Sequence, residues 1–184
     1  MAQEQSARLF IGLEPDDAAR QALERWAEEL KKRLGGRFYR PDMYHVTLAF
    51  LGQVERERIP LLTHFMQRCA LPPFEVSVDR LDAFKQGKIL FAGVSACPEL
   101  MRLQENLAAR LRGEGFALED APYVPHITLA RQGSGFEQPL SAPEIRFTAA
   151  AVTLFESTRV QDRLCYLPLA RVRLSAGRNA DAAL

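Results

Sequence analysis

The chain is poor in cysteine and has no long apolar run. Its three cysteines, Cys69, Cys97 and Cys165, are odd in number and widely spaced, which argues against a disulfide framework or a zinc site, so we expect buried free thiols. No apolar run approaches the roughly 18–20 residues of a membrane helix. Residues 1–7 show no basic-then-apolar signal segment. We therefore expect a cytoplasmic protein that does not enter a membrane.

The chain also lacks an excess of charge of either sign. Lysine and arginine total 24 against 23 aspartates and glutamates, which gives a net charge of +1. Proteins that coat nucleic acid by neutralising many phosphates usually carry a clear basic excess. If this protein handles RNA, we expect it to hold one end or one phosphate.

The usual metal and cofactor motifs are missing from the sequence. It contains no His-x-His, no His-Glu-x-x-His and no aspartate cluster at a spacing that suits a metal. It also contains no glycine-rich phosphate loop and no Gly-x-Ser-x-Gly motif. We therefore predict a site that uses neither a metal ion nor a cofactor.

The apolar pattern predicts one α+β domain with two similar halves over residues 1–174 and a frayed polar tail at 175–184. With 47% hydrophobic residues the chain can bury a sizeable core, and we expect a monomer. Apolar residues at period two predict strands, and spacings of three and four predict helices. The predicted strands are 9–13, 44–51, 74–78, 89–94, 125–130, 145–155 and 164–174, the helices 16–34, 56–69 and 98–113, and a turn lies at 85–88.

One short pattern occurs twice in the chain. His45-Val46-Thr47-Leu48 and His126-Ile127-Thr128-Leu129 lie far apart in the sequence and use two of its three histidines. The alternation is typical of a strand that turns its histidine and threonine to one face. The third histidine, His64, has no threonine two residues later, and we leave it out of the site. The repeat predicts an internal duplication with two imidazoles and two hydroxyls at one cleft.

The extended motifs resemble those of the 2H phosphoesterases. They are Arg8-Leu9-Phe10-Ile11, His45-Val46-Thr47-Leu48-Ala49-Phe50-Leu51-Gly52 and Pro125-His126-Ile127-Thr128-Leu129-Ala130-Arg131. They are most similar to the bacterial LigT-like RNA 2′,3′-cyclic phosphodiesterases, formerly called 2′-5′ RNA ligases. Tyr44 and Val124 depart from the residues common in that family. The resemblance implies two antiparallel sheets that form a central groove, with the repeated motifs on facing central strands and helices packed outside.

The resemblance also implies a reaction that the residues can perform. Opening a cyclic phosphate with water needs one base and one acid, and imidazole supplies either form because its pKa is near 6.5. We predict that His126 is the general base and His45 the general acid in the hydrolysis of RNA 2′,3′-cyclic phosphate ends to 2′-phosphates. The residues alone leave this assignment open, because the two halves look alike.

Three further residues complete the predicted site. Thr47 and Thr128 would hydrogen-bond to nonbridging phosphate oxygens, and Arg131 would neutralise the charge that grows on them. Arg131 follows His126 by five residues and would face away from it in a regular strand. We therefore expect a bulge, or the end of the strand, to turn Arg131 inward.

Two other functions use the same groove. One is the reverse chemistry, in which a 2′,3′-cyclic end joins a 5′-hydroxyl to give a 2′-5′ bond. The other is a protein that binds RNA ends without turnover. The near-neutral net charge argues mildly against the second alternative.

Overall fold

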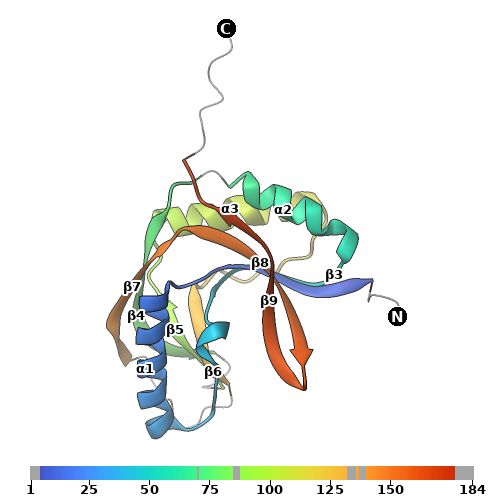
Figure 1. Ribbon diagram of the computed structural model, residues 1–184. Coiled ribbons are helices and arrows are strands. Elements are labelled where there is room, and N and C mark those ends of the chain that lie inside the picture. The colour runs from blue at the N-terminus through green and yellow to red at the C-terminus, as the bar shows by residue number, and fades with distance from the viewer. Residues whose placement is uncertain (1–4, 70, 85–87, 132–135, 137–139, 177–184) are drawn as a thin grey trace.

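Nine strands form one curled antiparallel sheet in the computed structural model, which describes residues 5–69, 71–84, 88–131, 136 and 140–176 (Figure 1). The strands are β1 (Ser6–Leu13), β2 (Arg37–Phe38), β3 (Val46–Glu55), β4 (Phe74–Phe84), β5 (Ile89–Val94), β6 (His126–Arg131), β7 (Leu140–Ala149), β8 (Ala151–Val160) and β9 (Arg163–Arg173). The helices are α1 (Asp17–Leu34), α2 (Ile59–Gln67) and α3 (Pro98–Gly113), with 3₁₀ turns at Pro41–Met43 and Arg56–Arg58. Along the sheet the strand order is β7-β4-β5-β6-β3-β1-β8-β9, and β2 pairs with β6.

The sheet consists of two matching halves that meet at its middle. One half has the order β3-β1-β8-β9 and the other the order β6-β5-β4-β7, so each half begins with one of the repeated motifs. Val46 and Ile127 are the one described residue pair that joins β3 to β6. At Ala130 and Arg131, β6 pairs with β2 instead. The two predicted sheets are therefore two halves of one sheet, and they diverge beyond the central pair. The predicted α+β class and duplicated two-lobed architecture are confirmed.

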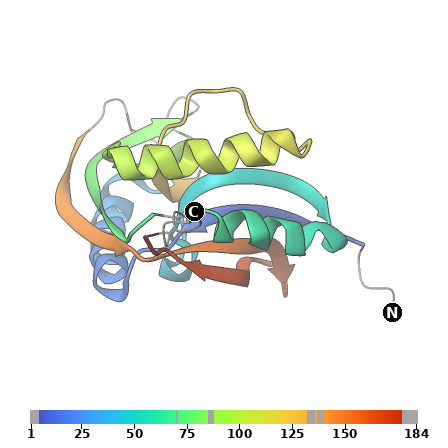
Figure 2. The same ribbon diagram turned by 90° about the horizontal axis from the view of Figure 1, so that it is seen from above.

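The helices link the two halves. In each half a helix connects two strands that are antiparallel neighbours in the sheet. Helix α1 connects β1 to β3, and α3 connects β5 to β6. However, α1 packs against β7 of the opposite half, and α3 contacts β3 as well as β4. The helices α2 and α3 lie side by side on the same face (Figure 2). Packing across the duplication holds the two motif strands in one rigid frame.

Helix α1 begins and ends where its sequence predicts. The carboxylate of Asp16 accepts a hydrogen bond from the backbone N–H of Ala19 at 2.9 Å, which caps the first turn. The helix ends at Gly35, whose φ of 61° favours glycine. Its apolar stripe is buried at Ala19, Leu23, Trp26, Ala27 and Leu30.

Several predicted boundaries differ from the structure. The strand predicted at 74–78 continues to Phe84 as β4, the strand predicted at 9–13 begins at Ser6, and the short strand β2 was not predicted. The predicted strand at 145–155 is two strands, because the chain leaves one half of the sheet at Ala150 and enters the other. No glycine or proline marks this crossing in the sequence. The predicted helix at 56–69 opens as a 3₁₀ turn, and Pro60 lies in the first turn of α2, as expected. The first motif strand starts at Val46, so His45 directly precedes it.

Two predicted segments lie wholly or partly outside the described residues. Residues 85–87 of the predicted turn belong to this group, and so do residues 177–184 of the predicted tail. Residues 175 and 176 have neither helical nor strand structure. The tail and the division of the chain into domains stay predictions.

The three cysteines are free thiols. Cys69 is buried, but Cys97 and Cys165 are only half-buried. The expectation of buried thiols is therefore wrong for these two, because Cys97 lies at the start of α3 and Cys165 lies on the edge strand β9. No described helix combines the length and the apolar character needed to cross a membrane.

Candidate active site

His45 lies at the start of β3 with its ring held on one side by the backbone. Its Nδ1 lies 2.7 Å from the carbonyl oxygen of Met43, two residues earlier in the chain. A carbonyl oxygen only accepts hydrogen bonds, so Nδ1 carries the proton and the neutral ring keeps a lone pair on Nε2. That Nε2 lies 3.0 Å from the hydroxyl of Thr47. The hydroxyl therefore donates to the neutral ring.

His126 repeats this arrangement in the other half. Its Nδ1 lies 2.7 Å from the carbonyl oxygen of Val124, again two residues earlier. The same reasoning fixes the proton on Nδ1 and leaves Nε2 as the reactive nitrogen. Within the described part of the chain, no hydrogen bond joins His126 Nε2 to Thr128. The two histidines share one tautomer but differ in whether Nε2 has a partner.

The duplication extends to the aromatic rings behind the histidines. Phe10 lies 4.6 Å from the ring of His45, and Phe91, at the corresponding position of the second half, lies 5.1 Å from the ring of His126. The two phenylalanines are separated in the sequence by the same interval as the two histidines. Both are almost fully buried. Each imidazole therefore lies beside a buried phenylalanine ring from the neighbouring strand, β1 in one half and β5 in the other.

A second ring meets each imidazole edge-on. Tyr166 on β9 contacts His45 at 5.1 Å and 88°, and Phe84 on β4 contacts His126 at 5.0 Å and 80°. The two halves differ at this position, because Tyr166 has a hydroxyl group and Phe84 has none. Burial raises the pKa of Tyr166 to about 12, and Tyr39 adds to the rise. The phenol is therefore neutral and able to donate a hydrogen bond near neutral pH.

Burial lowers the pKa of both histidines. The pKa of His45 falls to about 4, mainly because burial penalises the cation, and the nearby charge of His126 lowers it further. The pKa of His126 falls for the same main reason, although its bond to Val124 opposes the shift. Both rings are therefore neutral in the free protein near pH 7. The two histidines directly precede Val46 and Ile127, which pair where β3 meets β6.

Arg131 reaches the groove through the expected bulge. In the pairing of β5 with β6, Phe91 faces Thr128 and Leu90 faces Ala130, so Leu129 is an extra residue. This extra residue puts Arg131 on the same side as Thr128. The predicted bulge is confirmed.

Tyr39 holds the Arg131 guanidinium. Arg131 Nε donates a hydrogen bond to the hydroxyl of Tyr39 at 2.5 Å. Tyr39 also raises the pKa of Tyr166, whereas the charge of Arg131 lowers it, so both groups act on the Tyr166 phenol. Tyr166 also contacts His45. Arg131 thus contacts Tyr39, and His45 contacts Tyr166.

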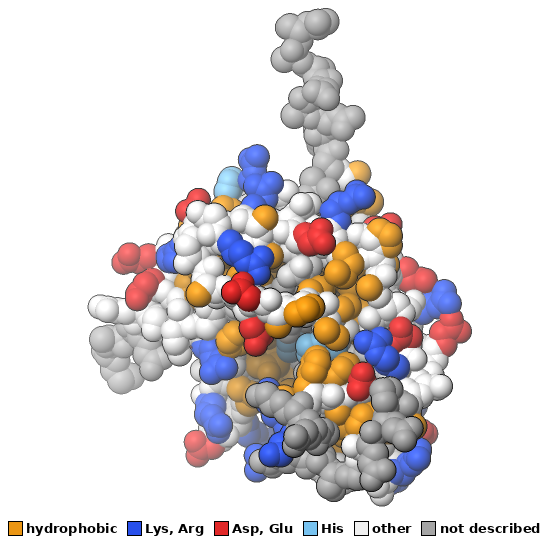
Figure 3. Space-filling view, turned by 180° about the vertical axis from the view of Figure 1, so that it is seen from behind, with side chains coloured by type: hydrophobic (Ala, Val, Ile, Leu, Met, Phe, Trp, Pro, Cys, Tyr) orange, Lys and Arg blue, Asp and Glu red, His pale blue; other side chains and the backbone are white. Residues whose placement is uncertain are grey.

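A groove of about 1080 Å³ runs between the halves of the sheet. Thr47, His126, Thr128 and Arg131 line it, and His45 reaches it through its hydrogen bond to Thr47. In Figure 3 a hollow is visible with histidine inside it and hydrophobic side chains around its rim. Four of the five residues predicted from the sequence therefore line the groove, and the fifth, His45, contacts the lining residue Thr47.

Tyr44 lies in the core, whereas Tyr123 both lines the groove and ties two parts of the chain together. The hydroxyl of Tyr123 donates to the backbone carbonyl of Thr47 at 3.0 Å and ties the loop before β6 to β3. Arg40 pairs with Asp42 and does not line the groove. His64 is exposed on α2.

Sequence reasoning missed Tyr39 and Tyr166, because no local pattern marks them. Tyr39 is 92 residues from Arg131 in the chain, and only the fold brings the two together. A signal was available for Phe10 and Phe91, because the interval between them equals the interval between the two motifs. Among the described residues there is no group of three or more histidine, cysteine, aspartate or glutamate side chains that would hold a metal ion.

Comparison with known proteins agrees with this geometry. Residues 15–161 match the family described as the 2′-5′ RNA ligase superfamily. The RNA 2′,3′-cyclic phosphodiesterase of Escherichia coli K12 is 27% identical over 170 residues, which cover 91% of this chain and 97% of that protein. The protein of the same name from Thermotoga maritima is 31% identical over 130 residues, covering 67% and 69%.

Solved structures show the same fold. The crystal structure of E. coli LigT complexed with 3′-AMP superposes with a TM-score of 0.84 and 26% identity over 92% of this chain and 98% of that chain. TT0787 of Thermus thermophilus superposes with a TM-score of 0.79 and 25% identity over 91% and 97%. The chain therefore belongs to the 2′-5′ RNA ligase superfamily, the 2H phosphoesterases that its doubled motif resembles.

Proposed function

We propose that this protein hydrolyses RNA 2′,3′-cyclic phosphate ends to 2′-phosphates without a metal ion. The observation that carries the proposal is the matched pair of imidazoles, each with Nδ1 bonded to a backbone carbonyl. Nε2 of His126 has no partner among the described residues, and Nε2 of His45 is bonded to the groove residue Thr47. The names of the E. coli and T. maritima relatives, RNA 2′,3′-cyclic phosphodiesterase, support it.

His126 acts as the general base in this proposal. Its Nε2 is neutral and has no partner among the described residues, so it is ready to take a proton from water. The water oxygen then bonds to phosphorus while the bond from phosphorus to the ribose 3′ oxygen breaks. The phosphate stays on the 2′ oxygen.

His45 acts as the general acid and protonates the departing 3′ oxygen. It must be charged to do so, and its pKa of about 4 in the free protein opposes this. A phosphate anion between the two rings reverses the local field and favours the imidazolium. Substrate binding is therefore expected to bring a proton with it. Once His45 has given up its proton, the hydroxyl of Thr47 can again donate a hydrogen bond to its Nε2.

The remaining groups hold the phosphate. Thr47 and Thr128 present hydroxyls to the groove, and Arg131 offers the rest of its guanidinium beyond the Nε bonded to Tyr39. Charge grows on the nonbridging oxygens as water attacks, and positioned donors stabilise it most at that point. Because two imidazoles supply both proton transfers, the proposed reaction needs no Lewis acid.

The reverse reaction uses the same groups. A 5′-hydroxyl in place of water would give a 2′-5′ bond, as the name of the superfamily suggests. A protein that only binds RNA ends would show tight binding of a 2′-phosphate nucleotide with no turnover between pH 5 and 8. Incubation with a 2′,3′-cyclic nucleotide in EDTA, followed by identification of the products, separates the three. Hydrolysis predicts a 2′-phosphate and little joined RNA.

A further inference from the structure

The strand pairing in the first half of the sheet does not reach the motif histidine. Strands β1 and β3 pair as far as Leu13 and Val46, so the pairing stops one residue short of His45. The carbonyl oxygen that fixes its Nδ1 belongs to Met43, which lies further out, in the 3₁₀ turn Pro41–Met43. The pairing of β1 with β3 therefore holds neither the imidazole nor the carbonyl group that orients it.

The second half differs at the same place. The pairing of β5 with β6 includes His126 itself. It is extended by one further bond, because the N–H of Val94 donates to the carbonyl oxygen of Pro125 at 3.0 Å. Val124, whose carbonyl oxygen holds Nδ1 of His126, directly precedes Pro125. The sheet thus supports the second histidine directly, whereas the first histidine needs another support.

Arg20 of α1 joins the two chain segments beyond the end of the pairing. Its guanidinium donates one hydrogen bond to the carbonyl oxygen of Pro41 at 2.6 Å and another to that of Pro15 at 3.2 Å. Pro15 follows the last residue of β1 by two positions, and Pro41 begins the 3₁₀ turn that contains Met43. The planar guanidinium fixes the direction of both bonds. One half-buried side chain therefore ties the chain that leaves β1 to the turn that precedes β3.

The Pro41 carbonyl group connects Arg20 to the histidine. The same oxygen accepts the N–H of Tyr44 at 3.2 Å, which closes the 3₁₀ turn. A shift of Pro41 therefore moves Met43, two residues later, and the imidazole that its carbonyl oxygen holds. A catalytic group displaced by about 1 Å can lose on the order of 10²-fold in rate.

Arg20 lies away from the residues that line the groove of about 1080 Å³. It lines a separate hollow of about 680 Å³, together with Glu14, Arg40, Pro41 and Asp42. The duplication does not repeat it, because the corresponding position of α3, by the interval between the two motifs, is Met101. An effect of Arg20 on the reaction must therefore pass through the first histidine alone.

We propose that Arg20 is a positioning residue that holds the turn before β3 and thereby the tautomer and the place of His45. The inference rests on the proposed function, in which His45 protonates the departing oxygen, and adds a residue that neither motif contains. With Nδ1 held by Met43, the ring presents Nε2 to the substrate. Without Arg20 the carbonyl oxygen of Met43 is free to move, and the proton is no longer kept on Nδ1.

The test is ¹⁵N–¹H NMR of the histidine rings, which distinguishes the two tautomers. The chain has three histidines, so variants that lack one histidine at a time assign the signals. In the wild type we expect the proton on Nδ1 of both His45 and His126. Arg20→Met keeps an apolar side chain but has no donor. It should give mixed tautomers at His45, leave His126 unchanged and lower kcat/KM for a 2′,3′-cyclic nucleotide by about tenfold.

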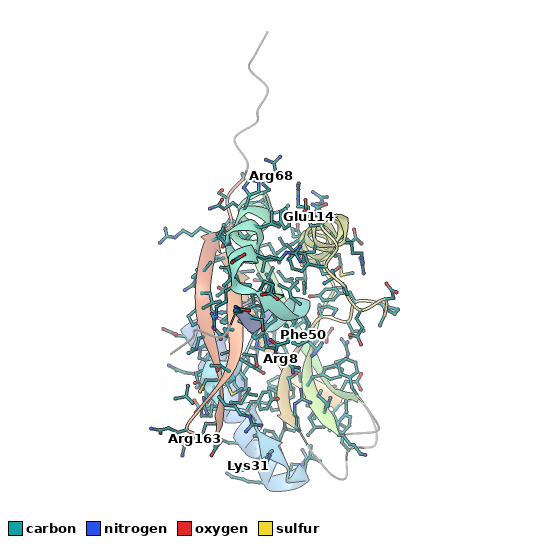
Figure 4. All side chains as sticks on the ribbon, turned by 90° about the vertical axis from the view of Figure 1, so that its right-hand side faces the viewer. Arg8, Lys31, Phe50, Arg68, Glu114 and Arg163 are labelled. Atoms are coloured by element: carbon teal, nitrogen blue, oxygen red, sulfur yellow. The ribbon has the colours of Figure 1, made fainter. Side chains whose placement is uncertain are left out.

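Two further variants separate positioning from a general loss of stability. Lys31→Met removes an exposed cation near the other end of α1, where Figure 4 labels it, and should leave both rings and kcat/KM unchanged. Arg20→Lys keeps a donor for Pro41 but cannot hold two carbonyl oxygens in a fixed geometry. Its His45 signals and its kcat/KM should lie between those of the wild type and those of Arg20→Met.

Three outcomes in Arg20→Met would overturn the proposal: wild-type signals of His45, equal changes at His45 and His126, or an unchanged kcat/KM beside an altered His45. If Arg20→Met does not fold, Arg20→Lys decides, and wild-type His45 signals in that variant would sink the idea. The spectra need no turnover. If the wild type hydrolyses no cyclic nucleotide, the proposed function fails, and the tautomer of His45 still decides whether Arg20 positions the ring.

Discussion

Gly12 makes room for His45. A Cβ atom on Gly12 would lie 2.8 Å from the carbonyl oxygen of Val46 and 3.4 Å from Cδ2 of the His45 ring. The first distance is too short for any real contact, and the atom it involves is backbone, which cannot rotate away. The glycine on β1 therefore fixes how closely β1 approaches the start of β3, and with it the position of the imidazole.

Gly12→Ala is expected to damage both the site and the fold. The added methyl group must push β1 away from β3, at a cost of about 1–3 kcal/mol in the free energy of unfolding, and it displaces His45. We expect at least a tenfold loss of kcat/KM, measured beside a urea unfolding curve. The matched control is Gly93→Ala at the corresponding position of the second half, whose methyl group would meet the Arg80 side chain at 2.6–2.8 Å. Because that flexible side chain can move, Gly93→Ala should lose less; equal losses would contradict this view.

His45→Ala and His126→Ala should each lower kcat by about 10²- to 10⁴-fold, or about 3–5 kcal/mol of barrier. Both remove one proton transfer while the groove stays in place. The rates are measured with a cyclic mononucleotide in EDTA, which should leave the wild-type rate unchanged. His64→Ala, on the exposed face of α2, serves as the control. Full activity in either groove variant would exclude the proposed chemistry.

The pH dependence of kcat/KM should reflect the lowered pKa values of the histidine pair. The active form carries one proton on the pair, and both pKa values lie below 6.5, that of His45 at about 4. The optimum should therefore lie below about pH 6.5, with a decline at higher pH as the acid loses its proton. For kcat, which reports the bound complex, the decline should shift to higher pH, because the phosphate raises the pKa of the acid. A kcat/KM that still rises above pH 7 would contradict this assignment.

Stability should depend on pH through His45. Its pKa is about 4 in the folded protein and near 6.5 in the unfolded chain, so between these values the unfolded state binds the extra proton. Folding stability from this group is complete above about pH 6.5 and is lost as the pH falls toward 4. His45→Asn keeps a donor for Met43 but does not titrate, so its stability should fall less on acidification. Parallel curves for the two proteins, from urea unfolding between pH 4 and 7, would refute the prediction.

Tyr39→Phe should weaken substrate binding through Arg131. The change removes the acceptor that holds Arg131 Nε and leaves the ring in place. We expect KM to rise several-fold with a smaller change in kcat, because the guanidinium binds the phosphate in both states. In an Arg131→Gln background, Tyr39→Phe should have little further effect, since the two residues act as one unit. Additive losses in the double variant would show that Tyr39 acts separately from Arg131.

The fold and the motif residues were largely predictable, for definite physical reasons. The alternation in each tetrad and the helical stripe of α1 are local patterns, and the structure follows them. The bulge before Arg131 was also predictable, because a side chain five residues after His126 faces the wrong way in a regular strand.

The remainder depends on contacts between distant parts of the chain. The Tyr39–Arg131 bond joins residues from different elements, and no sequence pattern announces it. The sequence around Ala150 has a continuous strand-like pattern, yet β7 ends there and β8 begins. The two strands pair with different halves of the sheet, which the local pattern does not reveal. The interval between the two tetrads, applied to the rest of the chain, would have pointed to Phe10, Phe91, Gly12 and Gly93.

In the proposed reaction, two imidazoles open a 2′,3′-cyclic phosphate and leave the phosphate on the 2′ oxygen. The most direct measurement is ³¹P NMR of a 2′,3′-cyclic nucleotide incubated with the protein in EDTA. We predict conversion to the 2′-phosphate alone, at a rate that EDTA does not change. A 3′-phosphate product, or loss of turnover on chelation, would contradict the account.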